Sequence, residues 1–498
     1  MNDPPLDALR AEAVVIGTGA GGAPAAAVLA EAGLDVLVLE AGPRLSARDF
    51  SADEPTMRSQ LGRMTASADG RHSFYAGTCA GGSTVVNDAL CWRTPPEVLE
   101  RWRHEYGLAA LTERAFAPYQ DRAWADLHAE PTERSHLNRN AQVLERGARR
   151  LGWAAEVMPR SVRGCANLGR CNFGCPIDAK QSTLVSYLPR AERAGARLLA
   201  NTRVDRVRIE SGRVTGVDAT RLDPGTRATL GALRVDAPLV CVAAGALESG
   251  ALLQRSGLPA AGGGFQAHSS LYVTGRFAEP IHGYYGPTMA YAISEFSDVN
   301  GHAGPGYMLE NTAVHPIVTA GALPGFGTDH ARWMRALPQL AHTVVVLRDR
   351  SRGELRVARS GDTEIHYALD ADDLERLRHA IDHAARAYLA AGAVEVALPL
   401  EDTAPVRSER DLARLADIPL DPSRSCFLYA VHLFGGAAMG ASPESSSCSE
   451  EGRCWGVKGL YVTDASSLPS NTGVNPQITI VANALRIAEG IAATARLA

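Results

Sequence analysis

The sequence predicts an α/β fold in which a parallel sheet is assembled from distant segments of the chain. Three patterns predict this fold: a glycine-rich strand–helix–strand pattern near the start, a buried strand followed by a helix at 237–257, and an apolar C-terminal helix. The chain has 498 residues, 46% hydrophobic and 21% charged, so we expect a globular protein of two or more domains.

The first element is the stretch AEAVVIGTGAGGAPAAAVLAEAGLDVLVLEAG at 11–42. Two apolar runs of strand length flank an alanine-rich helical stretch, as in the βαβ unit of Rossmann-like domains. Gly17 allows a tight turn, Gly19 lets the backbone approach a pyrophosphate, and Gly22 lets helix and strand pack closely. The diphosphate would lie at the helix N-terminus, and Glu40 can accept hydrogen bonds from ribose hydroxyls. The motif predicts a dinucleotide but does not choose between FAD and NAD.

A second glycine-rich segment, GTCAGGSTVVNDALCWRTP, lies far along the chain from the first. Gly81 and Gly82 allow the backbone to approach a flat ligand, and the Asn87 amide can both donate and accept. Residues 198–219 alternate as two strands around a Ser-Gly turn, and 237–257 form a buried strand, a turn and a helix. We expect these segments to add strands to the sheet and to form part of the sheet edge that faces the nucleotide.

Composition excludes several classes of function. The net charge is −5 and no Lys/Arg cluster occurs, which argues against binding to nucleic acid or to an anionic membrane surface. The first residues lack the basic end and apolar stretch of a signal peptide, and we expect no apolar run of membrane-spanning length. We therefore expect a cytoplasmic protein that acts on a small molecule, of unknown oligomeric state.

Four ordered blocks resemble the glucose-methanol-choline oxidoreductases, FAD enzymes that oxidise alcohols. The blocks are VVIGTGAGG, GTCAGGSTVVN, GALESGALLQRSGL, and HLFGGAAMG leading to GLYVTDASSLPSNTGVNPQITIVANALRIAE. One departure is Gly250, where the family usually has Pro or Ser, which is expected to loosen the start of a helix. The resemblance implies a Rossmann-like FAD domain made of 1–105, 161–262 and 425–498. It also implies an α+β substrate domain with an antiparallel sheet, made of 106–160 and 263–424.

The C-terminal helix is preceded by a long polar run. Asn475 is a good N-cap and Pro476 suits the first helical position, so the positive end of the helix dipole would face whatever the polar run binds. The resemblance implies that Asp464 binds the ribityl and pyrophosphate part of FAD. The alternative is a polar surface loop with an ordinary cap. The complete set of residues expected at the cofactor is Gly17, Gly19, Gly22, Glu40, Gly81, Gly82, Ser83, Asn87, Val204, Ala244, Asp464, Val474, Pro476 and Gln477.

His432 lies in the segment FLYAVHLFGGAAMG, and a lone histidine in apolar surroundings is more often a core residue. The resemblance implies instead that His432 and Asn475 face the flavin N5 and the substrate hydroxyl. An imidazole titrates near neutral pH, so His432 could take the hydroxyl proton while the neighbouring C–H leaves as hydride. Asn475 would donate a hydrogen bond to the developing alkoxide.

Cys165, Cys171 and Cys175 lie within eleven residues and can be read in two ways. Some members of the family hold an iron–sulfur cluster with a similar segment. The alternative is a cysteine-rich loop that packs near the flavin, with or without one disulfide. The spacing does not fit zinc, because a fourth ligand is lacking. We expect no metal here. We also expect FAD to be held without a covalent bond, because Val86 stands where members with a covalent flavin have histidine.

The sequence therefore predicts oxidation of a primary or secondary alcohol to an aldehyde or ketone by hydride transfer to FAD, with oxygen or another compound as electron acceptor. Three alternatives stay open: an iron–sulfur-containing catalytic subunit that passes electrons to a partner, a lyase with a non-redox flavin, and an NAD-linked dehydrogenase. The stretch IHGYYGPTMAYAISEF at 281–296 hints at a hydrophobic or aromatic alcohol, although it reads equally well as a core strand.

Overall fold

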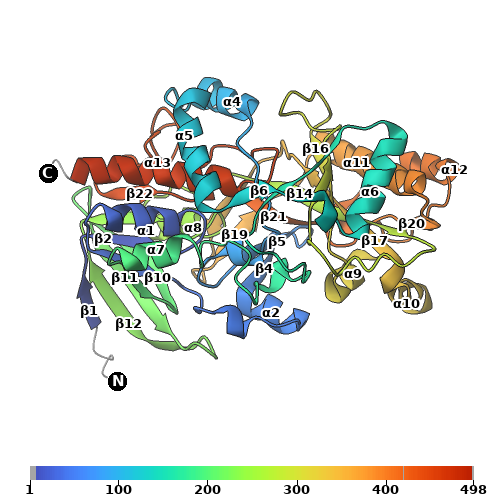
Figure 1. Cartoon of the computed structure of the whole chain (residues 1–498). Helices are drawn as coiled ribbons and strands as arrows, with labels where there is room; N and C mark the ends of the chain where they lie inside the picture. The colour runs from blue at the N-terminus through green and yellow to red at the C-terminus, as the bar shows by residue number, and fades with distance from the viewer. Residues whose placement is uncertain (1–6, 419, 496–498) are drawn as a thin grey trace.

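The computed structural model describes residues 7–418 and 420–495, and its core contains a five-stranded parallel sheet (Figure 1). The strand order is β22-β13-β2-β3-β9, so strands from both ends of the chain lie side by side, as predicted. This spatial order, in which β2, the first of these strands in the chain, lies in the middle of the sheet, is the doubly wound arrangement of dinucleotide-binding domains. The strands are β2 (Ala13–Ile16), β3 (Val36–Leu39), β9 (Arg197–Leu199), β13 (Leu239–Val242) and β22 (Leu460–Val462).

Helices α1 (Gly22–Glu31), α7 (Tyr187–Arg193) and α13 (Gln477–Ala495) lie together on one side of this sheet (Figure 1). Helix α13 is apolar enough, with a mean hydropathy of 1.3 over a membrane-length window, to span a bilayer by length and composition. The expectation that no run reaches this length was therefore wrong. Helix α13 packs between α1 and α5 (Glu113–Asp126), and 61% of that window is buried, as in the core helix of a globular domain.

A four-stranded sheet, β1-β12-β11-β10, lies beside the parallel sheet (Figure 1). Its hairpin turns at Ser211 and Gly212, whose φ angles of 49° and 70° suit the tight turn that joins two twisted strands. This hairpin confirms the pair of strands expected around the Ser-Gly turn. The strands are β1 (Asp7–Arg10), β10 (Thr202–Glu210), β11 (Arg213–Leu222) and β12 (Thr229–Asp236).

The third sheet is large and mostly antiparallel, with the order β4-β5-β21-β14-β17-β16-β15-β7. One face, which includes Leu271, Leu309 and Val345, packs against α6 (Arg139–Leu151) and α11 (Ala371–Ala391). The opposite face is directed toward the parallel-sheet domain. The strands on this path are β4 (Gly62–Ala66), β5 (Ser73–Gly77), β7 (Ala155–Val157), β14 (Gly263–Arg276), β15 (Tyr291–Ile293), β16 (Tyr307–Thr312), β17 (Leu340–Leu347) and β21 (Tyr429–Phe434).

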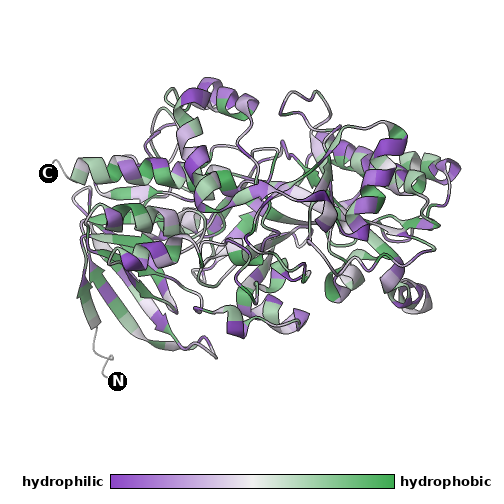
Figure 2. Ribbon diagram, in the orientation of Figure 1, coloured by the Kyte–Doolittle hydropathy of each residue, from purple (hydrophilic) through white to green (hydrophobic). Residues whose placement is uncertain are grey.

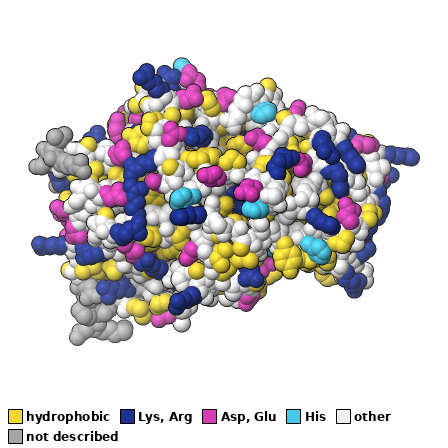
Figure 3. Space-filling model, in the orientation of Figure 1, with side chains coloured by type: hydrophobic (Ala, Val, Ile, Leu, Met, Phe, Trp, Pro, Cys, Tyr) yellow, Lys and Arg dark blue, Asp and Glu magenta, His cyan; other side chains and the backbone are white. Residues whose placement is uncertain are grey.

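The remaining elements surround these layers, and the outlying helices α4 and α10 carry mostly hydrophilic residues (Figure 2). They are α2 (Glu54–Leu61), α3 (Ser83–Val86), α4 (Pro96–Tyr106), α8 (Ser249–Arg255), α9 (Pro316–Ala322), α10 (Gly327–Arg335), α12 (Glu409–Leu412), β6 (Ala129–Pro131), β8 (Pro159–Ser161), β18 (Gly353–Val357), β19 (Thr363–His366) and β20 (Glu395–Ala397). On the face shown in Figure 3, Lys and Arg side chains lie among Asp and Glu side chains.

The expected domain boundaries remain a prediction. The segments assigned to the FAD domain and those assigned to the substrate domain interlock in the structure. Strands β4, β5 and β21 join the large sheet although 1–105 and 425–498 were assigned to the FAD domain. Helix α5, from the range 106–160, packs instead against α13. The chain thus crosses repeatedly between the two layers, and any site between them draws residues from both.

Gly250 at the start of α8 has a packing role that the sequence did not indicate. A Cβ added there would lie 2.7 Å from the carbonyl oxygen of Gly436, closer than real Cβ atoms come. The glycine therefore allows α8 to approach the 435–436 loop that follows β21.

Candidate active site

A large cavity runs between the parallel sheet and the large sheet. Its volume is about 1850 Å³, above the range of roughly 300–1,000 Å³ that is usual for small-molecule pockets. It extends from Glu40 at the end of β3 to Tyr272 on β14. The cavity therefore has room for a dinucleotide and a second molecule together.

The first glycine-rich turn forms one end of this cavity. A Cβ at Gly17 would lie 2.3 Å from the Ala243 carbonyl oxygen, and one at Gly22 would lie 2.0 Å from the Gly17 carbonyl oxygen. Gly19 instead faces the cavity, with no atom closer to its added Cβ than 3.8 Å. The turn thus brings the N-terminus of α1, where backbone N–H groups favour an anion, to the cavity wall. This arrangement fits a pyrophosphate.

The Glu40 carboxylate is buried and already accepts three hydrogen bonds from the protein. Thr18 donates its backbone N–H at 3.0 Å and its hydroxyl at 2.5 Å, and the Gly42 N–H donates at 2.8 Å. Burial raises the pKa of Glu40, and the bonds from Thr18 and Gly42 oppose this rise. Because a carboxylate has about four acceptor positions, one remains for a ribose hydroxyl.

The second glycine-rich segment lies against the first. The Gly81 N–H donates to the Thr18 hydroxyl at 2.8 Å, so Gly81 joins the two loops although it does not line the cavity. Gly82, Ser83 and Asn87 line it directly. Among the other residues expected at the cofactor, Val204, Ala244, Pro476 and Gln477 also line the cavity, whereas Gly22 and Val474 are buried behind its wall.

Asp464 lies at the cavity, but its carboxylate is engaged by other groups. The Gly245 N–H and the Ser249 hydroxyl donate to one oxygen at 2.7 and 2.6 Å, and the Ser466 N–H donates to the other at 2.9 Å. A Cβ at Gly21 would lie 2.6 Å from the Asp464 Cα, so this glycine, which sequence analysis did not single out, permits the approach of α1. Asp464 therefore ties β22 to the turn between β13 and α8.

His432 and Asn475 meet at the middle of the cavity. The Nε2 atom of His432, on β21, lies 3.4 Å from the amide nitrogen of Asn475. Burial lowers the pKa of His432 to about 4, so its ring is neutral at neutral pH. The structure thus brings together the two residues predicted to be catalytic.

The expectation that Asn475 caps the C-terminal helix was wrong. Helix α13 begins at Gln477, and its first hydrogen bond runs from the Ile480 N–H to the Pro476 carbonyl at 3.0 Å, which makes Pro476 the N-cap. The Asn475 side chain lies outside the helix and is 3.4 Å from both Glu310 and His432. It therefore serves the cavity and not the helix.

Two buried residues at this point escaped the sequence analysis. The Nδ1 atom of His268 lies 3.2 Å from Nδ1 of His432, and His268 Nε2 accepts the Gly473 N–H at 3.1 Å. Glu310 places Oε2 3.4 Å from the Asn475 amide, and burial raises the pKa of Glu310 to about 8. A charged residue inside the apolar strand YMLENT was the one available signal for Glu310.

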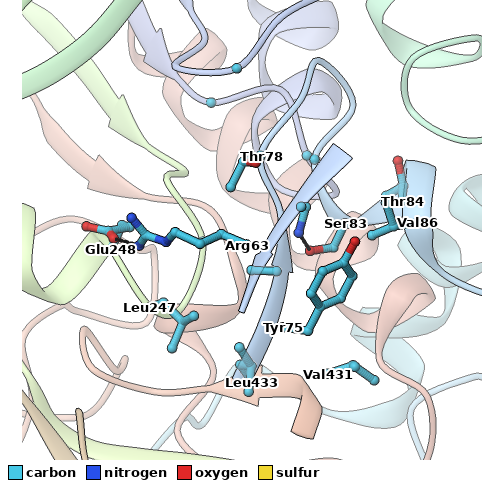
Figure 4. Close-up of a pocket in the computed structure, with 18 of the residues that line it drawn as sticks. Arg63, Tyr75, Thr78, Ser83, Thr84, Val86, Leu247, Glu248, Val431 and Leu433 are labelled. Carbon is cyan, nitrogen blue, oxygen red and sulfur yellow. Dashed lines mark hydrogen bonds and ion pairs between the residues drawn. The ribbon is translucent and has the colours of Figure 1, made fainter. Parts of the chain in front are cut away.

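Beyond His432 the cavity has an apolar wall, and Arg58, Asp88, Glu310 and His315 line the same part. Parallel rings of Tyr272, Tyr429 and Phe427 stack there, with centroids 5.2 and 5.0 Å apart along the series. The wall is completed by Leu90, Met289, Val318, Val344 and Val346. Figure 4 shows another part of the wall, where Val431 and Leu433 of β21 lie near Tyr75, and Arg63 pairs with Glu248.

The aromatic wall does not come from the stretch that was expected to supply it. Within 281–296 only Met289 lines the cavity, Tyr285 is 64% exposed, and only Tyr291–Ile293 form a strand. Glycine and proline at 283–287 keep this stretch irregular.

The three clustered cysteines are reduced and partly buried. The Cys171 sulfur lies 3.0 Å from the guanidinium of Arg160, a buried residue. In the described part of the chain, the one group of three potential ligand atoms within 4.8 Å of one another is Asp370, Asp372 and Asp373, outside this segment. The absence of a metal at the cysteines remains a prediction.

Comparisons with known proteins agree with this geometry. The sequence profile of GMC oxidoreductases matches residues 15–270 with its N-terminal part and 349–484 with its C-terminal part. An uncharacterised GMC-type oxidoreductase of Mycobacterium tuberculosis is 37% identical over 489 residues, which covers 96% of this chain and 75% of that protein. A long-chain-alcohol oxidase of Arabidopsis thaliana is 30% identical over 512 residues, covering 97% and 67%.

Solved structures show the same fold. Pyridoxine 4-oxidase from Mesorbium loti superposes with a TM-score of 0.72 at 19% identity, over 98% of this chain and 99% of that one. A variant of the formate oxidase of Aspergillus oryzae gives a TM-score of 0.74 at 15% identity, over 99% and 100%. The chain belongs to the GMC oxidoreductase family, whose members bind FAD.

Proposed function

We propose that this GMC oxidoreductase oxidises a hydrophobic primary or secondary alcohol to an aldehyde or ketone with non-covalently bound FAD. The observation that carries the proposal is the position of His432 and Asn475, where the polar, glycine-lined half of the cavity meets its apolar wall. A substrate hydroxyl would lie beside these two side chains. The relatives named long-chain-alcohol oxidases support the same class of substrate.

The residues of the polar half fit FAD. The Gly17–Gly22 turn and the N-terminus of α1 would hold the pyrophosphate, and Glu40 would accept from a ribose hydroxyl. The N-terminus of α13, with Pro476 and Gln477 at the cavity, would stabilise negative charge on the ring system. When bound, the flavin supplies the two-electron acceptor that takes a hydride from the carbinol carbon.

The protein groups at the apolar wall orient the alcohol. His432 Nε2 and the Asn475 amide nitrogen lie 3.4 Å apart, so an alcohol oxygen placed beside both would accept hydrogen bonds that stabilise charge as its O–H bond weakens. The stacked rings of Tyr272, Tyr429 and Phe427 would contact the hydrocarbon part and exclude water. An apolar alcohol gains about 25 cal/mol for each Å² of its surface that this wall buries.

A panel of alcohols tests the proposal. Purified protein is mixed anaerobically with straight-chain alcohols of increasing length, aromatic alcohols and sugars, and the loss of oxidised-flavin absorbance is followed. We expect reduction by the apolar alcohols, with apparent affinity that rises with chain length, and none by the sugars. Reduction by sugars alone would overturn the substrate class, and a flavin that no alcohol reduces would overturn the reaction.

A further inference from the structure

The hydrogen bonds behind His432 decide which of its nitrogens carries a proton. The Gly473 backbone N–H can only donate, and His268 Nε2 accepts it at 3.1 Å. A neutral His268 must then carry its proton on Nδ1, which lies 3.2 Å from Nδ1 of His432. Burial lowers the pKa of His268 well below its ordinary value, and that of His432 to about 4, so both rings are neutral at neutral pH.

It follows that His432 accepts at Nδ1 and carries its own proton on Nε2, the nitrogen nearer the cavity. The Asn475 amide nitrogen, 3.4 Å away, is itself a donor and cannot accept this proton. The His432 N–H is therefore available to the oxygen of a bound alcohol. The opposite tautomer of His268, with its proton on Nε2, would place two N–H donors against each other, because the Gly473 N–H points at the same nitrogen. In its resting state His432 is arranged to donate a hydrogen bond and not to take a proton.

Three carboxylate or amide oxygens of residues that line the cavity have no hydrogen-bond partner in the described part of the chain: Oε1 of Glu310, Oδ1 of Asn475 and Oδ1 of Asp88. An amide oxygen does not take a proton, and of the two carboxylates Glu310 is the one that contacts Asn475. The strand of Glu310, β16, is aligned so that Tyr272, Val344 and Glu310 form a row on the cavity face of the large sheet. The side chain is fully buried, and its Oε1 has no hydrogen-bond partner within the described residues. A buried carboxyl whose only hydrogen bond among the described residues is the long one from Asn475 is costly, which marks it as a functional group when it lines a cavity.

We propose that Glu310 accepts the hydroxyl proton of the alcohol, while His432 Nε2–H donates a hydrogen bond to the hydroxyl oxygen. The inference rests on the proposed function and assigns a role within the same site. The O–H bond breaks and its proton forms a carboxylic acid on Glu310. The C–H bond breaks with its electron pair, which leaves as hydride to the cofactor, and the carbon–oxygen double bond forms. The imidazole of His432 keeps its proton throughout.

The protonation of Glu310 then controls the rate. Burial raises its pKa to about 8, the Asn475 bond opposes this rise and Asp88 adds to it. At pH 7 only about a tenth of the protein carries the carboxylate, so flavin reduction should accelerate about tenfold toward pH 9 and then level off. The other titratable or charged side chains that line this part of the cavity are Arg58, Asp88, Tyr272, His315, Tyr429 and His432. A base with the pKa of His432 would instead give a rate that is constant above about pH 5.

The decisive variants are Glu310→Gln and Glu310→Asp, with Glu156→Gln as control because Glu156 is exposed on β7 of the same sheet. Anaerobic stopped-flow reduction is measured from pH 6 to 10. We expect Glu310→Gln to lose roughly 10²- to 10⁴-fold in rate together with the pH dependence. Glu310→Asp should recover part of the rate and keep the rise with pH. His432→Ala should lose rate and keep the rise, because it removes a hydrogen-bond donor.

A second readout does not depend on turnover. The pKa of Glu310 in the folded protein lies above its ordinary value of 4.5. The neutral carboxyl therefore contributes its whole stabilisation of the folded state below pH 4.5, and this contribution declines as the pH rises to about 8. The melting temperature of Glu310→Gln should therefore exceed that of the wild type by a margin that grows between pH 5 and 8. Infrared difference spectra should show a carboxylic acid band that disappears near pH 8 in the wild type and is missing from Glu310→Gln.

The outcomes separate the two proposals. If alcohols reduce the wild type and Glu310→Gln within about threefold of each other, Glu310 is not the proton acceptor although the proposed function holds. If the rise with pH disappears in His432→Ala and persists in Glu310→Gln, His432 is the base. If no alcohol reduces the wild type, both proposals fail.

Discussion

Replacement of Glu40 should destabilise the protein even without cofactor, because this carboxylate holds the protein's own backbone. Glu40→Ala leaves the N–H groups of Thr18 and Gly42 without their acceptor at the cavity wall. An unsatisfied buried donor costs about 1–3 kcal/mol, so two such donors give about 2–6 kcal/mol. Burial raises the pKa of Glu40, which means that burial disfavours its charged form. Removal of this carboxylate therefore offsets part of the cost. We expect a net loss near 2–3 kcal/mol.

The assay is urea denaturation of cofactor-free protein, with FAD affinity measured separately by fluorescence titration. The free energy of unfolding of Glu40→Gln should lie between those of the wild type and Glu40→Ala. The amide oxygen accepts from one backbone N–H, but the amide NH₂ is set against the other. Glu31→Ala is the matched control: Glu31 is an exposed acid on α1 that pairs with Arg190, so its loss should cost less than about 1 kcal/mol. If Glu40→Ala unfolds at the wild-type urea concentration while it binds FAD poorly, Glu40 is only a ribose ligand and the account of the loop is wrong.

Three further predictions concern the cofactor, the cysteines and Asn475. Acid or heat should release intact FAD and leave a colourless precipitate, because Val86 at the cavity wall cannot form a covalent bond; a yellow precipitate would refute this. Purified protein should contain no stoichiometric iron or acid-labile sulfide at Cys165, Cys171 and Cys175, and two or more irons per chain in anaerobic preparations would make the electron-transferring subunit the leading reading. Asn475→Ala should slow flavin reduction, and any fall in its melting temperature should come from the lost bond to Glu310, not from a lost helix cap, so the fall should shrink in the Glu310→Gln background; a fall of the same size in that background would show that the side chain supports α13.

The fold could be predicted from the sequence where local patterns carry it. The glycines at 17, 19 and 22 and the strand–helix pattern at 237–257 place β2, α1 and β13 because a βαβ unit closes over short distances in the chain. The resemblance assigned 425–498 to the FAD domain, but the pairing of β22 with β13 was not predicted, since no local rule joins residues that lie more than 200 positions apart.

The site was predicted only in part, because some of its residues are brought together by contacts between distant segments of the chain. His432 and Asn475 stood in motifs, whereas His268 and Glu310 reach the site through the registers of β14 and β16 in the large sheet, which no local pattern shows. Asn475 fitted an N-cap by residue type, but its side chain contacts Glu310 and the helix begins two residues later. Sequence preferences for caps do not reveal a competing tertiary contact.

The central claim is that bound flavin takes a hydride from an alcohol held beside His432 and Asn475. It is tested most directly by anaerobic stopped-flow mixing of the yellow protein with a hydrophobic alcohol, in ordinary form and deuterated at the carbinol carbon. We predict that the oxidised-flavin absorbance disappears in a single turnover, and more slowly with the deuterated alcohol because the C–H bond breaks in that step. Flavin that stays oxidised with every alcohol of the panel would contradict the account and favour a lyase with a non-redox flavin.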